Sequence, residues 1–161
     1  MNVCVIIAAS GKSTRMCGID KKLFSLDEIP VIIRSILAFD VIKDVSEIIV
    51  VTNSDSISEI SELLKKYSFR LQIRITEGGT TRQQSVFNGF KKVSENCDFV
   101  AVHDGARPLV LGNSIQNVFA DAFKNKASTL GVPVKDTIKE VDGGFICDTP
   151  NKSKLFITQT P

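Results

Sequence analysis

The sequence has few of the residues that soft-metal sites and disulfide frameworks need. It contains one histidine and four cysteines, and no two cysteines form a Cys-x-x-Cys pair. The cysteines are scattered along the chain, and Cys4 and Cys97 lie in or beside expected strands. This pattern favours reduced core or loop thiols of a cytosolic protein over metal ligands. A single histidine also argues against a zinc site.

The chain also lacks a long apolar run and an excess of charge of one sign. No apolar stretch approaches the roughly 20 residues that cross a bilayer, and the first residues resemble a strand rather than a charged leader. The net charge is +2, from 20 basic and 18 acidic residues that are interspersed. We therefore expect a soluble, cytoplasmic protein with no membrane and no nucleic-acid partner.

No repeat, linker or low-complexity segment divides the 161 residues, and 43% of them are apolar. This length and composition predict one domain over residues 1–161. Strands alternate with helices from Val3 to Val134, which predicts a doubly wound α/β fold with a mostly parallel sheet. Expected strands lie at 3–7, 46–52, 69–75, 98–102 and 128–134, and expected helices at 30–39 and 113–126, with others over the stripe 57–67 and after Gly79.

A hairpin is expected beyond the alternating region. Two short runs, 138–141 and 145–149, flank Asp142-Gly143-Gly144, which is a strong turn signal. Such a two-stranded ribbon is weak by itself. The sequence thus predicts a protruding β-hairpin arm over about residues 138–152.

The first strand and the loop after it form the most informative stretch. An apolar run from Val3 to Ile7 is typical of a central strand that helices cover on both faces. The chain then turns to small residues, followed by cations and hydroxyls at 12–15. Small residues allow backbone amides to approach a ligand, so this composition indicates a phosphate-binding loop at the carboxyl end of a strand.

Two motifs compete for this loop. Gly11-Lys12-Ser13-Thr14 matches the second half of a P-loop, but Ile6 stands where its first glycine belongs. From Ala9 the string Ala-Ser-Gly-Lys-Ser-Thr-Arg-Met resembles the Ala-Ala-Gly-x-Gly-x-Arg-Met loop of nucleotidyltransferases that activate sugar and alditol phosphates. Ser10 and Ser13 depart from that pattern, and both are small.

The resemblance assigns roles to residues of this loop and of the segment after it. It implies that Ala9, Ser10 and Gly11 bind the nucleotide, and that Arg15 is catalytic. In the same family a lysine beside a leucine or an aromatic residue holds the triphosphate. Lys22, in Lys-Leu-Phe, matches it best, and Lys21 is the alternative.

A second motif opens with paired glycines before a helix, where backbone amides can face a ligand. Gly78 to Val86 reads Gly-Gly-Thr-Thr-Arg-Gln-Gln-Ser-Val. It resembles the Gly-Gly-x-x-Arg-x-x-Ser-Val motif of cytidylyltransferases that act on methylerythritol phosphate and ribitol phosphate. The resemblance implies that Gly79 and Ser85 read the pyrimidine, with Thr80 where an acidic residue is common. We interpret Arg82 as a structural clamp between loops.

The third motif, His-Asp-Gly-Ala-Arg-Pro at 103–108, follows a buried strand. A carboxylate at this place suits Mg²⁺ bound to a triphosphate, which makes Asp104 the metal-ligand candidate; the alternative is that Asp104 caps the next segment. The motif is similar to that of the methylerythritol-phosphate cytidylyltransferases, more than to the ribitol-phosphate enzymes. It implies that Arg107 binds the acceptor phosphate. His103 is interpreted as positional, because a phosphate nucleophile has no proton to lose at neutral pH.

The last motif, Val134-Lys-Asp-Thr-Ile-Lys139, matches the Pro-Val-Lys-Asp-Thr segment of the same family. The resemblance implies that Thr137 touches the acceptor and that the arm swaps onto a second subunit of a homodimer. A basic residue of the arm would reach the partner's acceptor site. Here that residue is Lys152, where arginine is usual.

Together these motifs imply transfer of CMP from CTP to 2-C-methyl-D-erythritol 4-phosphate, with Mg²⁺ as cofactor and release of pyrophosphate. The pattern of this family continues past Pro161. We therefore expect a fragment that lacks the family's second metal-side carboxylate and a further acceptor-binding lysine. Three alternatives stay open: a ribitol-phosphate or other sugar-phosphate nucleotidyltransferase, a P-loop kinase or NTPase, and a non-catalytic nucleotide-binding module.

Overall fold

A computed structural model of the chain describes residues 1–11 and 20–159. Contacts between Cα atoms divide the chain into two compact units, Met1–Asn117 and Val118–Thr160. The expectation of one domain over residues 1–161 stays a prediction. Among the described residues, no helix is both long enough and apolar enough to span a membrane.

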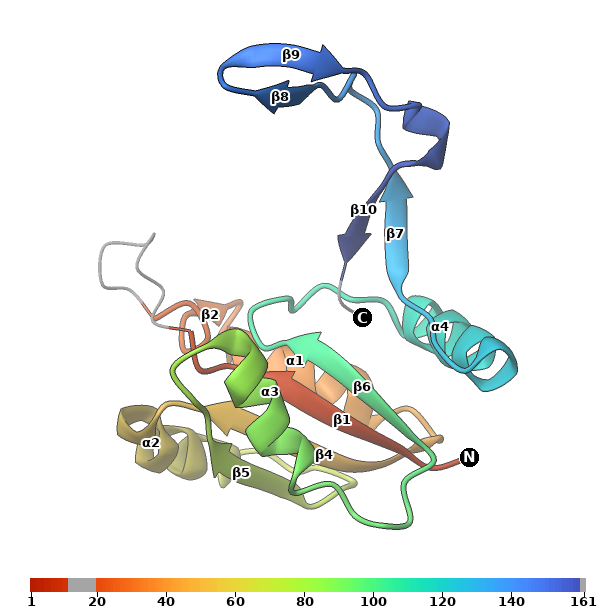
Figure 1. The fold of residues 1–161 in the computed structure, drawn as a ribbon. Helices are drawn as coiled ribbons and strands as arrows, with labels where there is room; N and C mark the ends of the chain where they lie inside the picture. Colours follow the sequence, from red (N-terminus) through yellow and green to blue (C-terminus); the bar gives the residue numbers. More distant parts are fainter. Residues whose placement is uncertain (12–19, 160–161) are drawn as a thin grey trace. The chain divides into compact units, whose positions relative to one another are not determined.

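The first unit is built around a four-stranded parallel sheet with the order β5-β4-β1-β6 (Figure 1). Strand β1 pairs with β4 on one side and with β6 on the other, so that Ile6 lies opposite both Ile49 and Val102. The strand order reverses between β1 and β6, and ligands of such sheets bind at that point beyond the carboxyl ends of the strands. The strands are β1 (Val3–Ala8), β4 (Val45–Thr52), β5 (Ile73–Glu77) and β6 (Phe99–Asp104).

Helices cover both faces of this sheet, with α1 behind it and α3 in front of it in Figure 1. Helix α1 buries Ile32, Ile33, Ile36 and Phe39 completely. Helix α3 approaches the sheet closely at Gly89, where a Cβ atom would lie 2.7 Å from Val51 Cγ2. The predicted doubly wound α/β fold is confirmed. The helices are α1 (Val31–Asp40), α2 (Ser54–Leu64), α3 (Arg82–Phe90) and α4 (Gly112–Asn125).

A small hairpin that the sequence analysis does not predict precedes α1. Its strands β2 (Ser25–Leu26) and β3 (Ile29–Pro30) are joined by Asp27 and Glu28, both with positive φ. The Arg34 guanidinium donates hydrogen bonds to the Leu26 carbonyl at 2.6 and 3.0 Å. The hairpin therefore fixes the segment that leads from Lys22 into α1.

The second unit contains two antiparallel pairs (Figure 1). Strand β7 (Leu130–Pro133) pairs with β10 (Phe156–Gln159), and β8 (Glu140–Asp142) pairs with β9 (Phe145–Asp148). Between β9 and β10 lies the 3-10 helix η2 (Lys152–Lys154). The β8–β9 turn uses Gly143 and Gly144 at φ values of 55° and 86°, which favour glycine. The predicted hairpin is thus present.

The strand expected at 69–75 begins later, at Ile73. The backbone amides of Arg70 and Leu71 instead bind the Asp40 carboxylate at 2.8 and 2.9 Å. The Arg70 side chain donates to the carbonyls of Asp40, Ile42 and Val45. This segment therefore joins the end of α1 to the start of β4, and its amides at 70 and 71 are not available to a sheet.

Candidate active site

The carboxyl ends of three strands are tied together by backbone hydrogen bonds. The amide of Ala9 donates to the Val51 carbonyl at 2.8 Å, and the amide of Gly105 donates to the Ala8 carbonyl at 2.9 Å. A Cβ atom at Gly105 would lie 2.9 Å from the Ala9 Cβ, so both residues must be small. The first loop and the third motif are therefore neighbours at the point where the strand order reverses.

The Ser85 hydroxyl joins the first loop to the second motif. It accepts hydrogen bonds from Ser10 Oγ at 2.8 Å and from the Gly79 amide at 3.0 Å, and it donates to the Thr81 carbonyl at 2.8 Å. Ser85 is buried. A Cβ atom at Gly78 would lie 2.8 Å from Ser10 Cβ and from Ser85 Oγ. Two motifs far apart in the sequence are thus brought into contact.

Thr80 and Thr81 organise the start of α3. Thr81 is the N-cap of the helix, and its hydroxyl accepts from the Gln84 amide at 3.1 Å. The amide and the hydroxyl of Thr80 both donate to Gln84 Oε1, at 3.0 and 2.9 Å. Gln84 was not predicted as part of the site, although its place three residues after Thr81 is a capping signal.

Lys22 is buried, and its ammonium group points to the end of β4. Its Nζ lies 2.6 Å from an Asp20 carboxylate oxygen and 3.2 Å from Asn53 Oδ1. The Lys22 carbonyl accepts from the Ile32 amide, which links this residue to the first turn of α1. Asp20 and Asn53 were missed by the sequence analysis. Arg15, like the Lys12 of the P-loop alternative, lies outside the described residues, whereas Gly11 is described and exposed.

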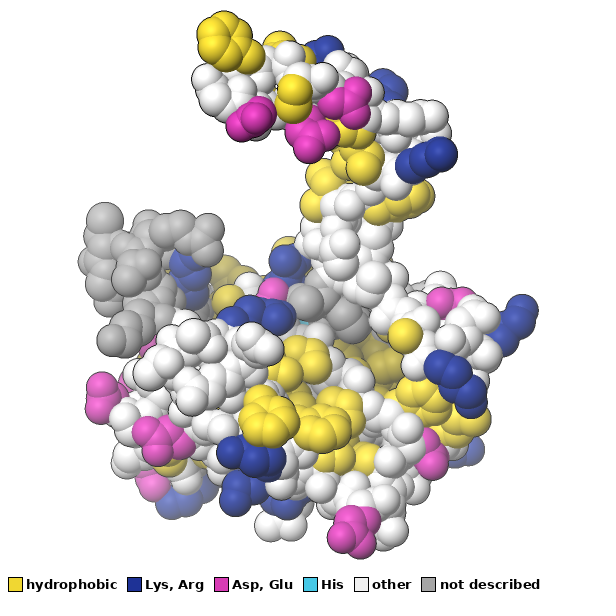
Figure 2. Space-filling model, viewed as in Figure 1, with side chains coloured by type: hydrophobic (Ala, Val, Ile, Leu, Met, Phe, Trp, Pro, Cys, Tyr) yellow, Lys and Arg dark blue, Asp and Glu magenta, His cyan; other side chains and the backbone are white. Residues whose placement is uncertain are grey.

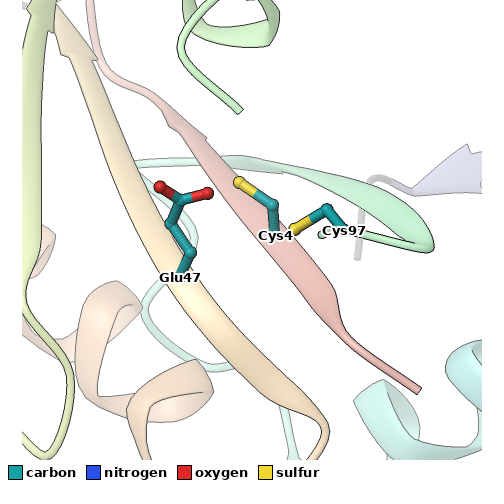
Figure 3. Close-up of side chains that lie close together, drawn as sticks. All are labelled: Cys4, Glu47 and Cys97. Carbon is teal, nitrogen blue, oxygen red and sulfur yellow. The ribbon is translucent and has the colours of Figure 1, made fainter. Parts of the chain in front are cut away.

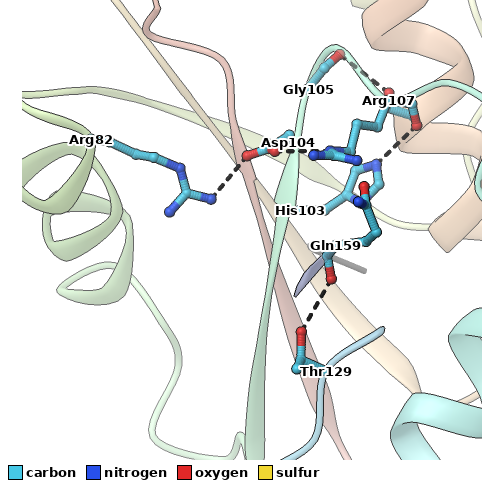
Figure 4. Close-up of polar contacts among 8 residues, drawn as sticks. Arg82, His103, Asp104, Gly105, Arg107, Thr129 and Gln159 are labelled. Atoms are coloured by element: carbon cyan, nitrogen blue, oxygen red, sulfur yellow. Dashed lines mark hydrogen bonds and ion pairs between the residues drawn. The ribbon is translucent and has the colours of Figure 1, made fainter. Parts of the chain in front are cut away.

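The Asp104 carboxylate lies between two arginines at the end of β6 (Figure 4). One oxygen is 2.9 Å from Arg82 Nη2, and the other is 3.0 Å from Arg107 Nε. Arg82 therefore connects α3 with β6, as the clamp interpretation expects. The two guanidinium groups concentrate positive charge at the edge where phosphates would bind.

His103, which precedes Asp104 in β6, is fully buried. Its ring contacts Phe39 edge to face, with 4.9 Å between the ring centroids. Its Nε2 donates to the Arg107 carbonyl at 3.1 Å, so this nitrogen carries the proton. Burial lowers the pKa of His103 below its usual value of 6.5, which keeps the ring neutral. His103 therefore supports the loop that carries Arg107.

Asp104 meets the requirements of a Mg²⁺ ligand. Mg²⁺ prefers hard oxygens and is often bound by one or two carboxylates together with substrate phosphates. The Asp104 side chain is 31% exposed. A carboxylate has two hard oxygen atoms with about four lone-pair positions in all. Nucleotidyltransferases commonly use divalent cations, and this residue fits that chemistry.

Thr137 and Lys152 belong to the second unit, and both are exposed. Lys152 is the first residue of η2, which Asn151 caps by accepting a hydrogen bond from the Ser153 amide at 3.0 Å. The assignment of Thr137 and Lys152 to acceptor binding stays a prediction.

A doubly wound parallel sheet, with small residues, paired glycines and two arginines at its carboxyl edge, defines a nucleotide-binding α/β protein. Comparison with known families then gives a more specific result. The profile described as "IspD: 2-C-methyl-D-erythritol 4-phosphate cytidylyltransferase" matches residues 3–161. The chain belongs to this family of nucleotidyltransferases.

Individual relatives agree with this family membership. A 2-C-methyl-D-erythritol 4-phosphate cytidylyltransferase of Caldanaerobacter subterraneus is 44% identical, over 100% of this chain and 72% of the relative. One of Clostridium botulinum (strain Loch Maree) is 41% identical, over 98% of this chain and 69% of the relative.

A solved structure of 4-diphosphocytidyl-2C-methyl-D-erythritol synthase from Anaerococcus prevotii has the same fold. It superposes with a TM-score of 0.86 and 29% identity, covering 99% of this chain and 67% of that one. The Francisella tularensis 2-C-methyl-D-erythritol 4-phosphate cytidylyltransferase superposes with a TM-score of 0.72 and 26% identity, over 100% of this chain and 71% of that one.

Proposed function

We propose that this protein transfers CMP from CTP to 2-C-methyl-D-erythritol 4-phosphate and releases pyrophosphate, as a cytoplasmic enzyme of isoprenoid precursor biosynthesis. The observation that carries the proposal is the hydrogen bonding at Ser85. This residue joins the Ala9 to Gly11 loop to the Gly78-Gly79 pair, within a chain of the cytidylyltransferase family. The two relatives described above are named for this reaction.

The nucleotide is assigned to the loop and the glycine pair. Backbone amides at Ser10 and Gly11 face the phosphates, because neither residue has a large side chain that would keep them away. Gly79 and Ser85 face the cytosine. The Ser85 hydroxyl holds the Gly79 amide, so the backbone that reads the base is fixed before the ligand arrives. Thr80 contributes its hydroxyl next to this position.

The reaction is an in-line displacement at phosphorus. A phosphate oxygen of the acceptor forms a bond to the α-phosphorus of CTP, and the bond from that phosphorus to the bridging oxygen of pyrophosphate breaks. No proton has to be removed from the nucleophile. The protein therefore contributes mainly positioning and stabilisation of negative charge.

Cationic side chains supply that stabilisation. Arg15 and Lys22 hold the triphosphate and the transition state, and burial of Lys22 strengthens its interaction with an anion. Arg107 and Thr137 bind the acceptor, together with Lys152 from a second chain. Asp104 would hold Mg²⁺, which would supply positive charge to neutralise the triphosphate.

The proposal includes a homodimer formed through the β8–β9 hairpin. Figure 2 shows hydrophobic side chains gathered on this hairpin, and Val141, Phe145 and Ile146 are 57%, 80% and 64% exposed. An isolated ribbon is marginally stable, so packing against a second copy would stabilise it.

Calorimetric binding of Mg-CTP, Mg-ATP and Mg-UTP to the 161-residue chain tests the nucleotide assignment. We expect a clear preference for CTP that Arg15→Ala abolishes. A preference for ATP that depends on Lys12 would contradict the proposal and favour a P-loop enzyme.

Pyrophosphate release then tests the acceptor. We expect release with methylerythritol phosphate and much less with ribitol 5-phosphate. CTP binding without release for either acceptor would favour a non-catalytic nucleotide-binding module instead.

A further inference from the structure

Three potential metal ligands meet at the amino-terminal edge of the sheet, at the opposite end of the strands from the nucleotide site. They are Cys4 near the start of β1, Glu47 near the start of β4, and Cys97 just before β6 (Figure 3). The two Sγ atoms and a carboxylate oxygen all lie within 4.8 Å of one another. The proposed transfer reaction uses none of these residues.

The cluster is accessible from one side. Cys4 is completely buried among core side chains, whereas Cys97 is half-buried. A cavity of about 350 Å³ adjoins them, and Glu47 and Cys97 are among its lining residues. A metal ion could therefore enter through this cavity, and a water molecule from it could complete the coordination.

Glu47 is held in place by neighbours that leave part of its carboxylate available. It forms an ion pair with Arg74, and it accepts hydrogen bonds from the amide and the hydroxyl of Ser94 at 3.1 and 3.2 Å. Its side chain is only 12% exposed. A carboxylate offers about four lone-pair positions. These contacts resemble the outer-shell hydrogen bonds that orient a metal-ligating carboxylate.

We propose that Cys4, Cys97 and Glu47 bind one Zn²⁺ ion, with water from the cavity as the fourth ligand. Thiolate and carboxylate ligands in a tetrahedral arrangement suit zinc, with Zn–S near 2.3 Å and Zn–O near 2.0 Å. Those bond lengths place the ligand atoms about 3.5–3.8 Å apart. The cluster would therefore contract by about 1.3 Å at most on binding the ion.

The zinc ion, its protein ligands and Arg74 would form a site with no net charge. Each thiol loses its proton to water as its Zn–S bond forms, and the two thiolates neutralise the 2+ charge of the ion. The charge of Glu47 is already compensated by Arg74. A neutral assembly of this kind lowers the cost of placing an ion at the edge of the core.

The ion would join three separate parts of the first unit: β1, β4 and the loop that enters β6. Its position at the amino-terminal edge gives it a structural role rather than one in the transfer reaction. The expected consequence is a gain in thermal stability, with nucleotide binding unaffected.

The test is titration of the reduced 161-residue chain with Co²⁺, followed by the thiolate-to-cobalt charge-transfer absorbance, and with Zn²⁺, followed by thermal unfolding. The starting protein carries Cys17→Ser and Cys147→Ser, which leaves only the two cysteines of the cluster. We expect one Co²⁺ per chain. Near-saturating Zn²⁺ should raise Tm by about 5 °C, as expected for a tight ligand of a domain of this size.

Two substitutions at partly exposed positions identify the ligands without depending on the buried Cys4. Cys97→Ser should abolish the charge-transfer band, and Glu47→Gln should weaken Co²⁺ binding at least tenfold, by the scale of ligand-shell substitutions. The proposal is overturned if the reduced parent protein binds no metal, or if Cys97→Ser binds as tightly as the parent. The proposal is also overturned if the protein, purified without oxygen, contains a Cys4–Cys97 disulfide and binds no metal.

Discussion

Ser85 is the residue on which the geometry of the candidate nucleotide site depends most directly. Its hydroxyl accepts hydrogen bonds from Ser10 Oγ and from the Gly79 amide, and the Ser85 side chain is buried. Ser85→Ala removes this oxygen and leaves the Gly79 amide without that acceptor, at a cost of about 1–3 kcal/mol. We expect about tenfold weaker CTP binding by calorimetry. Ser58→Ala, on the exposed side of α2, is the matched control, and an equal loss in both variants would contradict the role of Ser85.

Lys22 and Lys21 differ in ways that make them a matched pair for testing the triphosphate assignment. Lys22 is buried with its ammonium group beside Asn53, whereas Lys21 is half-exposed. Lys22→Met keeps the apolar stem but removes the charge, so turnover should fall on the order of a hundredfold, with much less change in KM for the acceptor. Lys21→Met should retain most of the activity. Steady-state kinetics of pyrophosphate release checks both, and the reverse ranking would assign the role to Lys21.

His103 makes stability depend on pH in a defined direction. Burial lowers its folded-state pKa below 6.5, so the unfolded chain takes up the proton first as the pH falls. The contribution of the neutral ring is fully present above pH 6.5 and is lost as the pH falls toward the folded-state pKa. Urea unfolding of the parent and of His103→Gln checks this. The stability difference between them should shrink from pH 7.5 to pH 5.5, and a constant difference would refute the assignment.

At the scale of the elements, Asp40 links the end of α1 to the segment before β5. Its buried carboxylate accepts from the amides of Arg70 and Leu71. Asp40→Ala leaves both amides without this acceptor and should lower the free energy of unfolding by about 2 kcal/mol. Urea unfolding measures it. Asp44→Ala is the control, because its exposed ion pair with the N-terminus, at 3.8 Å, should contribute less than about 1 kcal/mol.

Most of the helices and strands of the sheet were predictable from sequence patterns. Apolar runs and stripes predicted the parallel strands and the helices, because burial on one or both faces imposes a regular spacing on the sequence. The start of β5 was misplaced, since the alternation from Phe69 does not reveal that Asp40 binds the next amides. The β2–β3 hairpin was missed, because its strands are only two residues long and Glu28 stands at positive φ, where glycine is usual.

At the scale of the whole molecule, the hairpin gives a test of the dimer. The double variant Phe145→Ser/Ile146→Ser removes two exposed apolar side chains from β9, so the proposed dimer should dissociate. Analytical ultracentrifugation should show a dimer for the parent and a monomer for the variant, with CTP binding retained and turnover reduced. Phe87→Ser, an exposed apolar residue of α3, is the control. A parent that is monomeric at micromolar concentration would contradict the proposal.

The sequence by itself determined the alternation of strands and helices, the hairpin and the four motifs that carry the family resemblance. These features are local, because each depends on residues close together in the chain. Only the tertiary structure decided that Ser85 bonds Ser10, that two arginines meet on Asp104, and that Asn53 receives Lys22. It also brought Cys4, Glu47 and Cys97 together, although their spacing argued against a metal site. The physical reason is strand register: a parallel sheet aligns the ends of strands that are distant in sequence, and no local pattern encodes which side chains then face each other.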